Sequence, residues 1–227
     1  MELRSTAITL VLATTLALAM VAPRDVGATT LAGGEHLNPG EKAHEFYLGF
    51  PQLGYQWDFQ STGKRTLGLH VGAIVWPFTI HVGLSSRTLL GIHGRSVVSF
   101  RFEPGLYVGL YGGSRGIYVN MRWGRSKSLQ PTLGPVINLG VSASVEMRNS
   151  WSLILGFESP VVAWLRLSPF GWWVEWPILF DIGAEWDVSV RSTMFLKGAV
   201  GPVLGFAGDS QLAGVSVFVQ LGLQTNY

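Results

Sequence analysis

The sequence contains no cysteine, few charged residues and, after its first two dozen residues, no long apolar run. The absence of cysteine excludes disulfides, thiolate metal sites and lipid attachment at an N-terminal cysteine. Charged residues make up 13% of the chain, against about 25% in a typical soluble domain, while hydrophobic residues make up 48%. No stretch of roughly 18 apolar residues follows Ala22, so a helical membrane protein is not expected. The net charge of +2 gives no indication of a nucleic-acid partner.

The N-terminus has the three-part pattern of an export signal. Arg4 precedes an apolar run from Ala7 to Ala22, and the small residues Val26-Gly27-Ala28 offer a cleavage site. The alternative is a membrane anchor, but the run is shorter than the roughly 20 residues that a spanning helix needs. We therefore predict a signal peptide over residues 1–28, cleaved after Ala28.

Residues 29–45 are polar and rich in glycine, including Gly33-Gly34 and Asn38-Pro39-Gly40. We expect a mobile segment there, which lies either outside the following domain or folded into it. Residues 46–227 then form a single predicted domain.

That domain is dominated by alternation of apolar and polar residues, which predicts β-strands. In the clearest example, apolar residues from Ile137 to Met147 occupy every second position, with only polar or small residues between them. About 13 such segments follow one another, and single-chain membrane barrels have even strand numbers. The pattern predicts about twelve strands, within a range of eight to twelve. Trp76-Pro77 and Glu103-Pro104-Gly105 are predicted turns.

The last strand resembles the assembly signal of bacterial outer-membrane β-barrels. Gln220, Gly222 and Tyr227 occupy the polar, glycine and terminal aromatic positions of that signal, while Thr225 stands where a larger apolar residue is usual. The resemblance implies an all-β, antiparallel transmembrane β-barrel in the outer membrane of a Gram-negative (diderm) bacterium. It also implies contact with outer-membrane lipid and with the barrel assembly machinery, and other envelope proteins are further candidate partners.

A soluble β-sandwich or lipocalin-like barrel would show the same alternation with its apolar face turned inward. Two features argue against it. The polar face is mostly glycine, serine, threonine and asparagine, whereas soluble surfaces carry many lysines and glutamates. Aromatic residues also gather near predicted strand ends, as in the two girdles of a membrane barrel. The predicted girdle residues are Trp76, Phe78, Trp172, Trp173 and Trp176.

Two histidines are the most suggestive chemical feature. His70 and His81 both fall on the polar, lumen-facing side of neighbouring strands. If Trp76-Pro77 is the hairpin turn, His81 lies opposite Gly72 and diagonal to His70. Such a pair could bind a metal or act as an acid and base, or simply fill a polar lumen. We favour the last interpretation and expect no metal and no cofactor, because no carboxylate is evidently placed to complete a site.

Other predicted lumen-facing residues are charged. They are Arg101, Arg122, Glu146, Glu185 and Asp187, with Arg166 less clear because Trp164 shares its face. In a narrow barrel such charges pair across the lumen and plug it, and in a wide barrel they line a constriction. The sequence leaves both arrangements open.

The sequence predicts no enzyme. Barrel phospholipases and lipid A deacylases carry His-x-Ser, whereas this chain has His93-Gly94-Arg95-Ser96 in a predicted turn. Omptin-type proteases use paired aspartates, and here the aspartates are single. A small pore or passive channel is the first functional prediction. The alternative is a structural barrel in a motility, secretion or adhesion assembly, and a lipid-modifying enzyme is less favoured.

Overall fold

The computed structural model describes residues 32–34, 36–50, 52–74, 78–111, 118–119, 130–147, 151–168, 170–207 and 210–227. Every helix or strand assigned over these residues is a β-strand. Within this part of the chain, no helix is long and apolar enough to cross a membrane. The strands are β1 (Ala43–Phe50), β2 (Gln52–Ser61), β3 (Arg65–Ile74), β4 (Thr79–His93), β5 (Ser96–Tyr111), β6 (Tyr118–Val119), β7 (Gln130–Glu146), β8 (Trp151–Leu167), β9 (Phe170–Pro177), β10 (Leu179–Ser189), β11 (Ser192–Ala207) and β12 (Ser210–Asn226).

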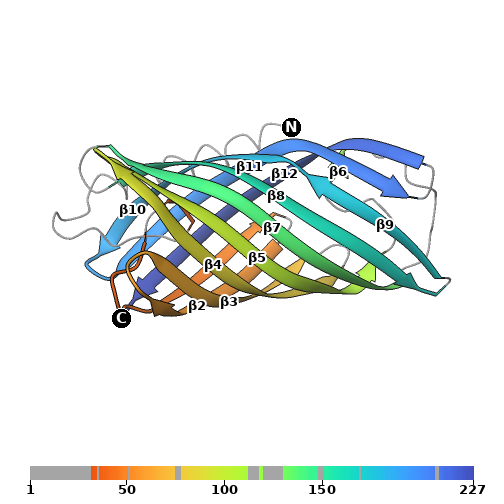
Figure 1. Ribbon diagram of the computed structural model, residues 1–227, viewed down its shortest axis with the longest axis horizontal. Helices are drawn as coiled ribbons and strands as arrows, with labels where there is room; N and C mark the ends of the chain where they lie inside the picture. Colours follow the sequence, from red (N-terminus) through yellow and green to blue (C-terminus); the bar gives the residue numbers. More distant parts are fainter. Residues whose placement is uncertain are drawn as a thin grey trace, which may run out of the picture.

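The strands form one closed antiparallel barrel, and they run obliquely along its long axis (Figure 1). Closure occurs where β1 pairs with β12 as well as with β2. β9 and β10 both pair with β8 and β11, so they are one wall strand interrupted at Ile178. The 12-stranded sheet therefore makes a barrel of ten wall strands, to which the two-residue β6 adds beside β12. The predicted all-β antiparallel barrel of about twelve strands is confirmed.

Side chains alternate between the two faces of the wall as the sequence pattern predicts. On β7, Ile137, Leu139 and Val141 point outward and are 39–50% exposed, whereas Ser142 and Ser144 point inward and are buried. Apolar residues thus cover the outside and polar residues fill the inside. This arrangement suits a hydrocarbon surrounding, because an apolar exterior is unfavourable in water. The soluble alternative, with its apolar face inward, does not hold.

The predicted hairpin between β3 and β4 is confirmed in its register, since Ile74 pairs with Thr79 and Gly72 with His81. The predicted turn at Glu103-Pro104-Gly105 is wrong, because β5 continues through it and Pro104 pairs with Ile137 of β7. Proline lacks an N–H and can sit in a strand only where that donor is not needed.

The two ends of the barrel differ. At one end Lys42 and Tyr227 exchange two backbone hydrogen bonds, and the connections between strands are short; we call it the turn end. The opposite, loop end carries the long connection between β5 and β7. Short turns face the periplasm in bacterial outer-membrane barrels, so we assign the turn end to that side.

The wall is lower on one side at the loop end (Figure 1). β1, β2 and β3 have 8, 10 and 10 residues, whereas β7, β8 and β12 have 17 each. Phe50 ends β1 opposite Val219, and β12 begins nine residues before Val219 in sequence, at Ser210, toward the loop end. Among the strands described, the rim is thus uneven, and β1, β2 and β3 form what we call the low wall.

The segment before β1 enters the barrel. β1 begins at Ala43, a little earlier than the predicted domain start, and Ala32–Gly34 lie inside the lumen. Of the two expected placements of this segment, the lumen is the one observed for these residues. The predicted signal peptide over residues 1–28 lies outside the described residues and stays a prediction.

Candidate functional site: a chamber in the lumen

A cavity of about 180 Å³ occupies the lumen, and side chains from β1 to β5 and from β7 to β12 line it. Three of its lining residues stand at the loop-end termini of strands: Gln52 begins β2, Ile74 ends β3 and Thr79 begins β4. The cavity, called here the chamber, therefore extends to the loop-end rim of the low wall. On the turn-end side it reaches Ala32 of the N-terminal segment.

A row of aromatic rings crosses the wall of the chamber from β3 to β9. His70 and His81 have ring centroids 4.3 Å apart, His81 stacks on Tyr107 at 4.3 Å, and Tyr107 lies 5.4 Å from Trp164. Trp164 then stacks on Trp173 at 6.0 Å. β7 contributes no ring to the row, and its Gly134 leaves the space that Trp164 fills; a Cβ there would meet the indole at 2.7 Å.

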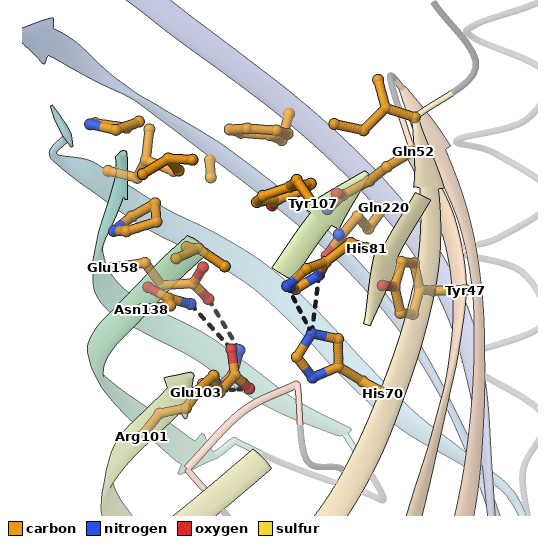
Figure 2. Close-up of a pocket in the computed structure, with 18 of the residues that line it drawn as sticks. Tyr47, Gln52, His70, His81, Arg101, Glu103, Tyr107, Asn138, Glu158 and Gln220 are labelled. Atoms are coloured by element: carbon orange, nitrogen blue, oxygen red, sulfur yellow. Dashed lines mark hydrogen bonds and ion pairs between the residues drawn. The ribbon is translucent and has the colours of Figure 1, made fainter. Parts of the chain in front are cut away.

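The histidine pair is formed as the hairpin register predicts (Figure 2). Nε2 of His70 lies 2.9 Å from Nδ1 of His81, so one ring donates and the other accepts. Both line the chamber, together with Glu103. Among the residues that the structure describes, no group of three or more His, Cys, Asp or Glu side chains is placed to hold a metal ion. Nδ1 of His70 stays buried without a partner among the described residues, so the contact satisfies only one nitrogen of that ring.

Below the aromatic row lies a network of buried ion pairs. Oε1 of Glu158 accepts from Arg101 Nη1 at 3.1 Å and from Lys197 Nζ at 2.7 Å. Lys197 also pairs with Asp181 at 3.3 Å, and Arg101 with Glu103 at 3.5 Å. These side chains are at most 18% exposed, so solvent screens them little. The network joins β5, β8, β10 and β11 across the lumen.

Four buried polar atoms of the chamber lack a partner among the described residues: Oε2 of Glu45, Oδ1 of Asn138, Nδ1 of His70 and Oγ1 of Thr79. The carboxylate and amide oxygens can only accept. The carboxylate of Glu45 is 6% exposed, and its Oε2 is buried without a hydrogen bond. The amide of Asn138 donates to Glu103 at 3.0 Å, but its Oδ1 accepts nothing. Buried acceptors are normally satisfied, so each is a place where a bound molecule could donate.

Ala32 of the N-terminal segment lines the chamber on its turn-end side, and the Gly33 and Gly34 peptides that follow it, called here the floor, are bound to the barrel wall. The carbonyl of Gly33 accepts from Arg87 Nη1 at 2.6 Å and from Ser142 Oγ at 2.7 Å. The carbonyl of Gly34 accepts from Ser99 Oγ at 2.5 Å. Thus side chains of β4, β5 and β7 hold a peptide from another part of the chain. Ala32 packs beside them against Ile154 and Phe195.

Glycine is required at this floor for steric reasons. A Cβ at Gly34 would lie 2.1 Å from the carbonyl oxygen of Val97 and 2.6 Å from the backbone nitrogen of Ser144. A Cβ at Gly33 would lie 2.1 Å from the hydroxyl of Ser144. The hydroxyl of Ser144 accepts from the backbone N–H of Gly34 and donates to Glu185, which completes the contact.

The other predicted lumen residues divide into three groups. Arg101 and Glu185 are placed in the lumen as predicted, and Asp187 is half-buried and accepts from Thr193. Glu146 lies on the same side of β7 as Ser142 and Ser144, but it is exposed because it is the last residue of the strand, at the turn end. Arg122 lies outside the described residues.

The predicted girdle is correct only in part. Phe78, Trp172 and Trp176 lie on the outer surface and are 56%, 56% and 39% exposed. Trp173 is corrected to a lumen residue, because adjacent strand residues face opposite sides and Trp173 donates to Glu175. Trp76 lies outside the described residues.

The residues of the resembled assembly signal have separate places. Tyr227 is exposed, stacks on His44 at 4.8 Å and accepts from Trp57 at 3.1 Å. Gln220 lines the chamber. Gly222 lies under the ring of Phe195, which a Cβ would meet at 2.2 Å. The structure gives each a packing role within the barrel.

Sequence reasoning missed five charged residues of the chamber. They are Glu45, Glu103, Glu158, Glu175 and Lys197. The sequence places Glu45 in the predicted mobile segment and Glu103 in a predicted turn, so alternation does not predict whether either side chain faces the lumen or the lipid. Glu158 and Lys197 lie where the alternation of apolar and polar residues is weak. Their lumen-facing orientation could have been found only by counting every second residue from a neighbour known to point inward.

Comparisons with known proteins identify no family for this chain. No family model matches the chain, and no curated protein matches it. Among solved structures, the outer membrane protease OmpT from Escherichia coli is similar over 82% of this chain and 93% of that chain, with 9% identity and a TM-score of 0.36. OmpT, an outer membrane protein of Vibrio cholerae, is similar over 82% of this chain and 96% of that chain, with 6% identity and a TM-score of 0.21.

The comparison with solved structures shows no family, and it is the strand topology of the chain itself that establishes the antiparallel β-barrel. The prediction that it is not an enzyme is corrected by the same comparison, because an outer membrane protease shares the barrel fold. At this identity the likeness concerns the fold alone, and it transfers no activity and no catalytic residue to this chain.

Proposed function

We propose that this protein is an outer-membrane barrel that holds a small ligand in a chamber open toward the outside and closed toward the periplasm. The single observation that carries the proposal is the floor. Gly33 and Gly34 lie across the lumen beneath the chamber and are held by Arg87, Ser99 and Ser142. A cavity above a closed floor favours retention of a solute over free passage.

The composition of the chamber supports the same proposal. Ligand sites combine an apolar wall with a few converging polar groups. Here Tyr107, Val136 and Trp164 supply the apolar wall, and Glu45 and Asn138 supply acceptors without partners among the described residues. At about 180 Å³ the space is comparable to cavities of about 150 Å³ that hold one benzene ring.

The predicted pore remains the second candidate, and one observation favours it. The floor is a segment of chain attached largely through side-chain hydrogen bonds, each worth about 1 kcal/mol net, so it could be displaced. In that case the barrel would be a passive channel with a removable plug. A structural role in an envelope assembly, with other envelope proteins as partners, is a further prediction that recovery of a partner in mild detergent would test.

Conductance across a planar bilayer distinguishes the first two functions. We expect the full chain to show no steady conductance. We expect Gly34→Ala to produce conductance steps, because the new Cβ would overlap the backbone of Val97 and displace the floor. Gly198→Ala is the matched control, since a Cβ there has 3.7 Å of clearance.

Two results would count against the proposal. Steady conductance by the unaltered chain would favour the passive channel. A Gly34→Ala variant that folds, as shown by a heat-dependent shift in gel mobility, and still does not conduct would mean that the floor is not what closes the lumen.

A further inference from the structure

We propose that the ligand of the chamber is a small organic cation. Its ammonium group binds Glu45, and its apolar body packs against the aromatic row. This inference rests on the proposed function, because it names the chemistry of the molecule that the chamber holds. Glu45 carries it: the side chain is 6% exposed, lines the chamber and has a buried oxygen without a partner among the described residues.

Charge in the lumen favours a cation. The buried charged side chains of the strands, at the chamber and on its turn-end side, include more carboxylates than cations. The carboxylates are Glu45, Asp58, Glu103, Glu158, Glu175, Asp181 and Glu185, and the cations are Arg87, Arg101 and Lys197.

None of those three cations contacts the carboxylate of Glu45. Arg101 and Lys197 each contact two other carboxylates, and Arg87 donates to the carbonyl of Gly33. These cations act on Glu45 only through space. A buried carboxylate is costly unless it is paired. A cation that enters the chamber would therefore be stabilised by an ion pair with Glu45, which no cation among the described residues forms.

The aromatic row favours an organic cation. Tyr47, Tyr107 and Trp164 line the chamber, and the faces of such rings attract ammonium and guanidinium groups. Figure 2 shows Tyr107 next to His81 and Tyr47 beside the histidine pair. A metal ion is less suited, because the described residues contain no group of three or more His, Cys, Asp or Glu placed to hold one.

The size of the chamber limits the ligand to about one ring or a short aliphatic chain beyond its ammonium group. An anion is disfavoured, since Arg101 and Lys197 are neutralised by carboxylates. Benzylammonium, benzyl alcohol and benzoate are therefore suitable probes: they have nearly the same shape and differ in charge.

The test measures the affinity of the three probes for the full chain in lipid nanodiscs by calorimetry, with empty nanodiscs as the blank. We expect benzylammonium to bind at least ten times more tightly than benzyl alcohol, and benzoate to bind most weakly. Glu45→Gln should remove the preference for benzylammonium and leave binding of benzyl alcohol unchanged. Glu146→Gln, at an exposed carboxylate, should keep the preference.

A second variant guards against misfolding of Glu45→Gln. Tyr107→Leu should weaken benzylammonium more than benzyl alcohol, because it removes a ring face but keeps an apolar side chain. Folding of each variant is checked by the heat-dependent gel shift.

The outcomes separate the two proposals. Equal affinity for benzylammonium and benzyl alcohol, or a preference that survives both Glu45→Gln and Tyr107→Leu, would overturn the cation inference while supporting a ligand chamber. Failure of all three probes to bind would overturn the ligand chamber, and the cation inference with it.

Discussion

Replacing Glu158 with glutamine should destabilise the barrel strongly. Glu158 Oε1 contacts both Arg101 and Lys197, at 3.1 and 2.7 Å. Removing one partner of a buried ion pair costs about 3–5 kcal/mol. Here each cation keeps a second carboxylate, Glu103 or Asp181, so we expect a loss of about 2–3 kcal/mol in the free energy of unfolding. That is a large share of the roughly 5–15 kcal/mol that stabilises a typical protein.

The measurement is equilibrium unfolding in denaturant with lipid vesicles, followed by tryptophan fluorescence and by gel mobility. Glu146→Gln is the control, since that carboxylate is exposed, and its effect should stay within about 0.5 kcal/mol. A double-mutant cycle with Lys197→Met should return a coupling energy of about 1–3 kcal/mol. A Glu158→Gln variant as stable as the control would refute the view that this network holds the lumen together.

Two further predictions concern packing and pH. Gly222→Ala should cost about 1–3 kcal/mol on the same assay, because its Cβ would lie 2.2 Å from the ring of Phe195; no change would mean that the ring relocates freely. In the segment before β1, burial and then the charge of Arg87 lower the pKa of His36 to about 4. Because that pKa lies below the unfolded value of 6.5, docking of the segment is strongest above pH 6.5 and weakens as the pH falls toward 4. Hydrogen exchange at Gly34 should therefore speed up over this range beyond the intrinsic change, and His36→Gln should remove the dependence.

The fold was predictable because strand alternation is a local signal. A period of two needs only neighbouring residues, and the hairpin at residues 74–79 fixed the register of β3 and β4 without any distant contact. The prediction failed where the signal was interrupted. Proline usually ends a strand, so Pro104 predicts a turn. In the structure β5 continues through it, because Pro104 still pairs with Ile137 of β7.

The site was predictable only as far as one hairpin reaches. His70 and His81 come from adjacent strands, so their contact follows from the register. Lys197 and Glu158 lie on β11 and β8, which are separated by β10, and they are 39 positions apart in sequence. A contact across the lumen depends on barrel closure and tilt, which no local pattern encodes.

The low wall has a consequence for the membrane itself. Phe50 ends β1 opposite Val219, while Val217 and Val215 continue the outward apolar surface of β12 at 40% and 44% exposure. Lipid beside β1–β3 therefore meets a shorter apolar surface than lipid beside β12. A bilayer adapts to such a mismatch by thinning locally, at a cost of fractions of a kcal/mol per ångström. The protein should accordingly sit in an asymmetric annulus, with the outer leaflet drawn down on the side where the chamber reaches the rim.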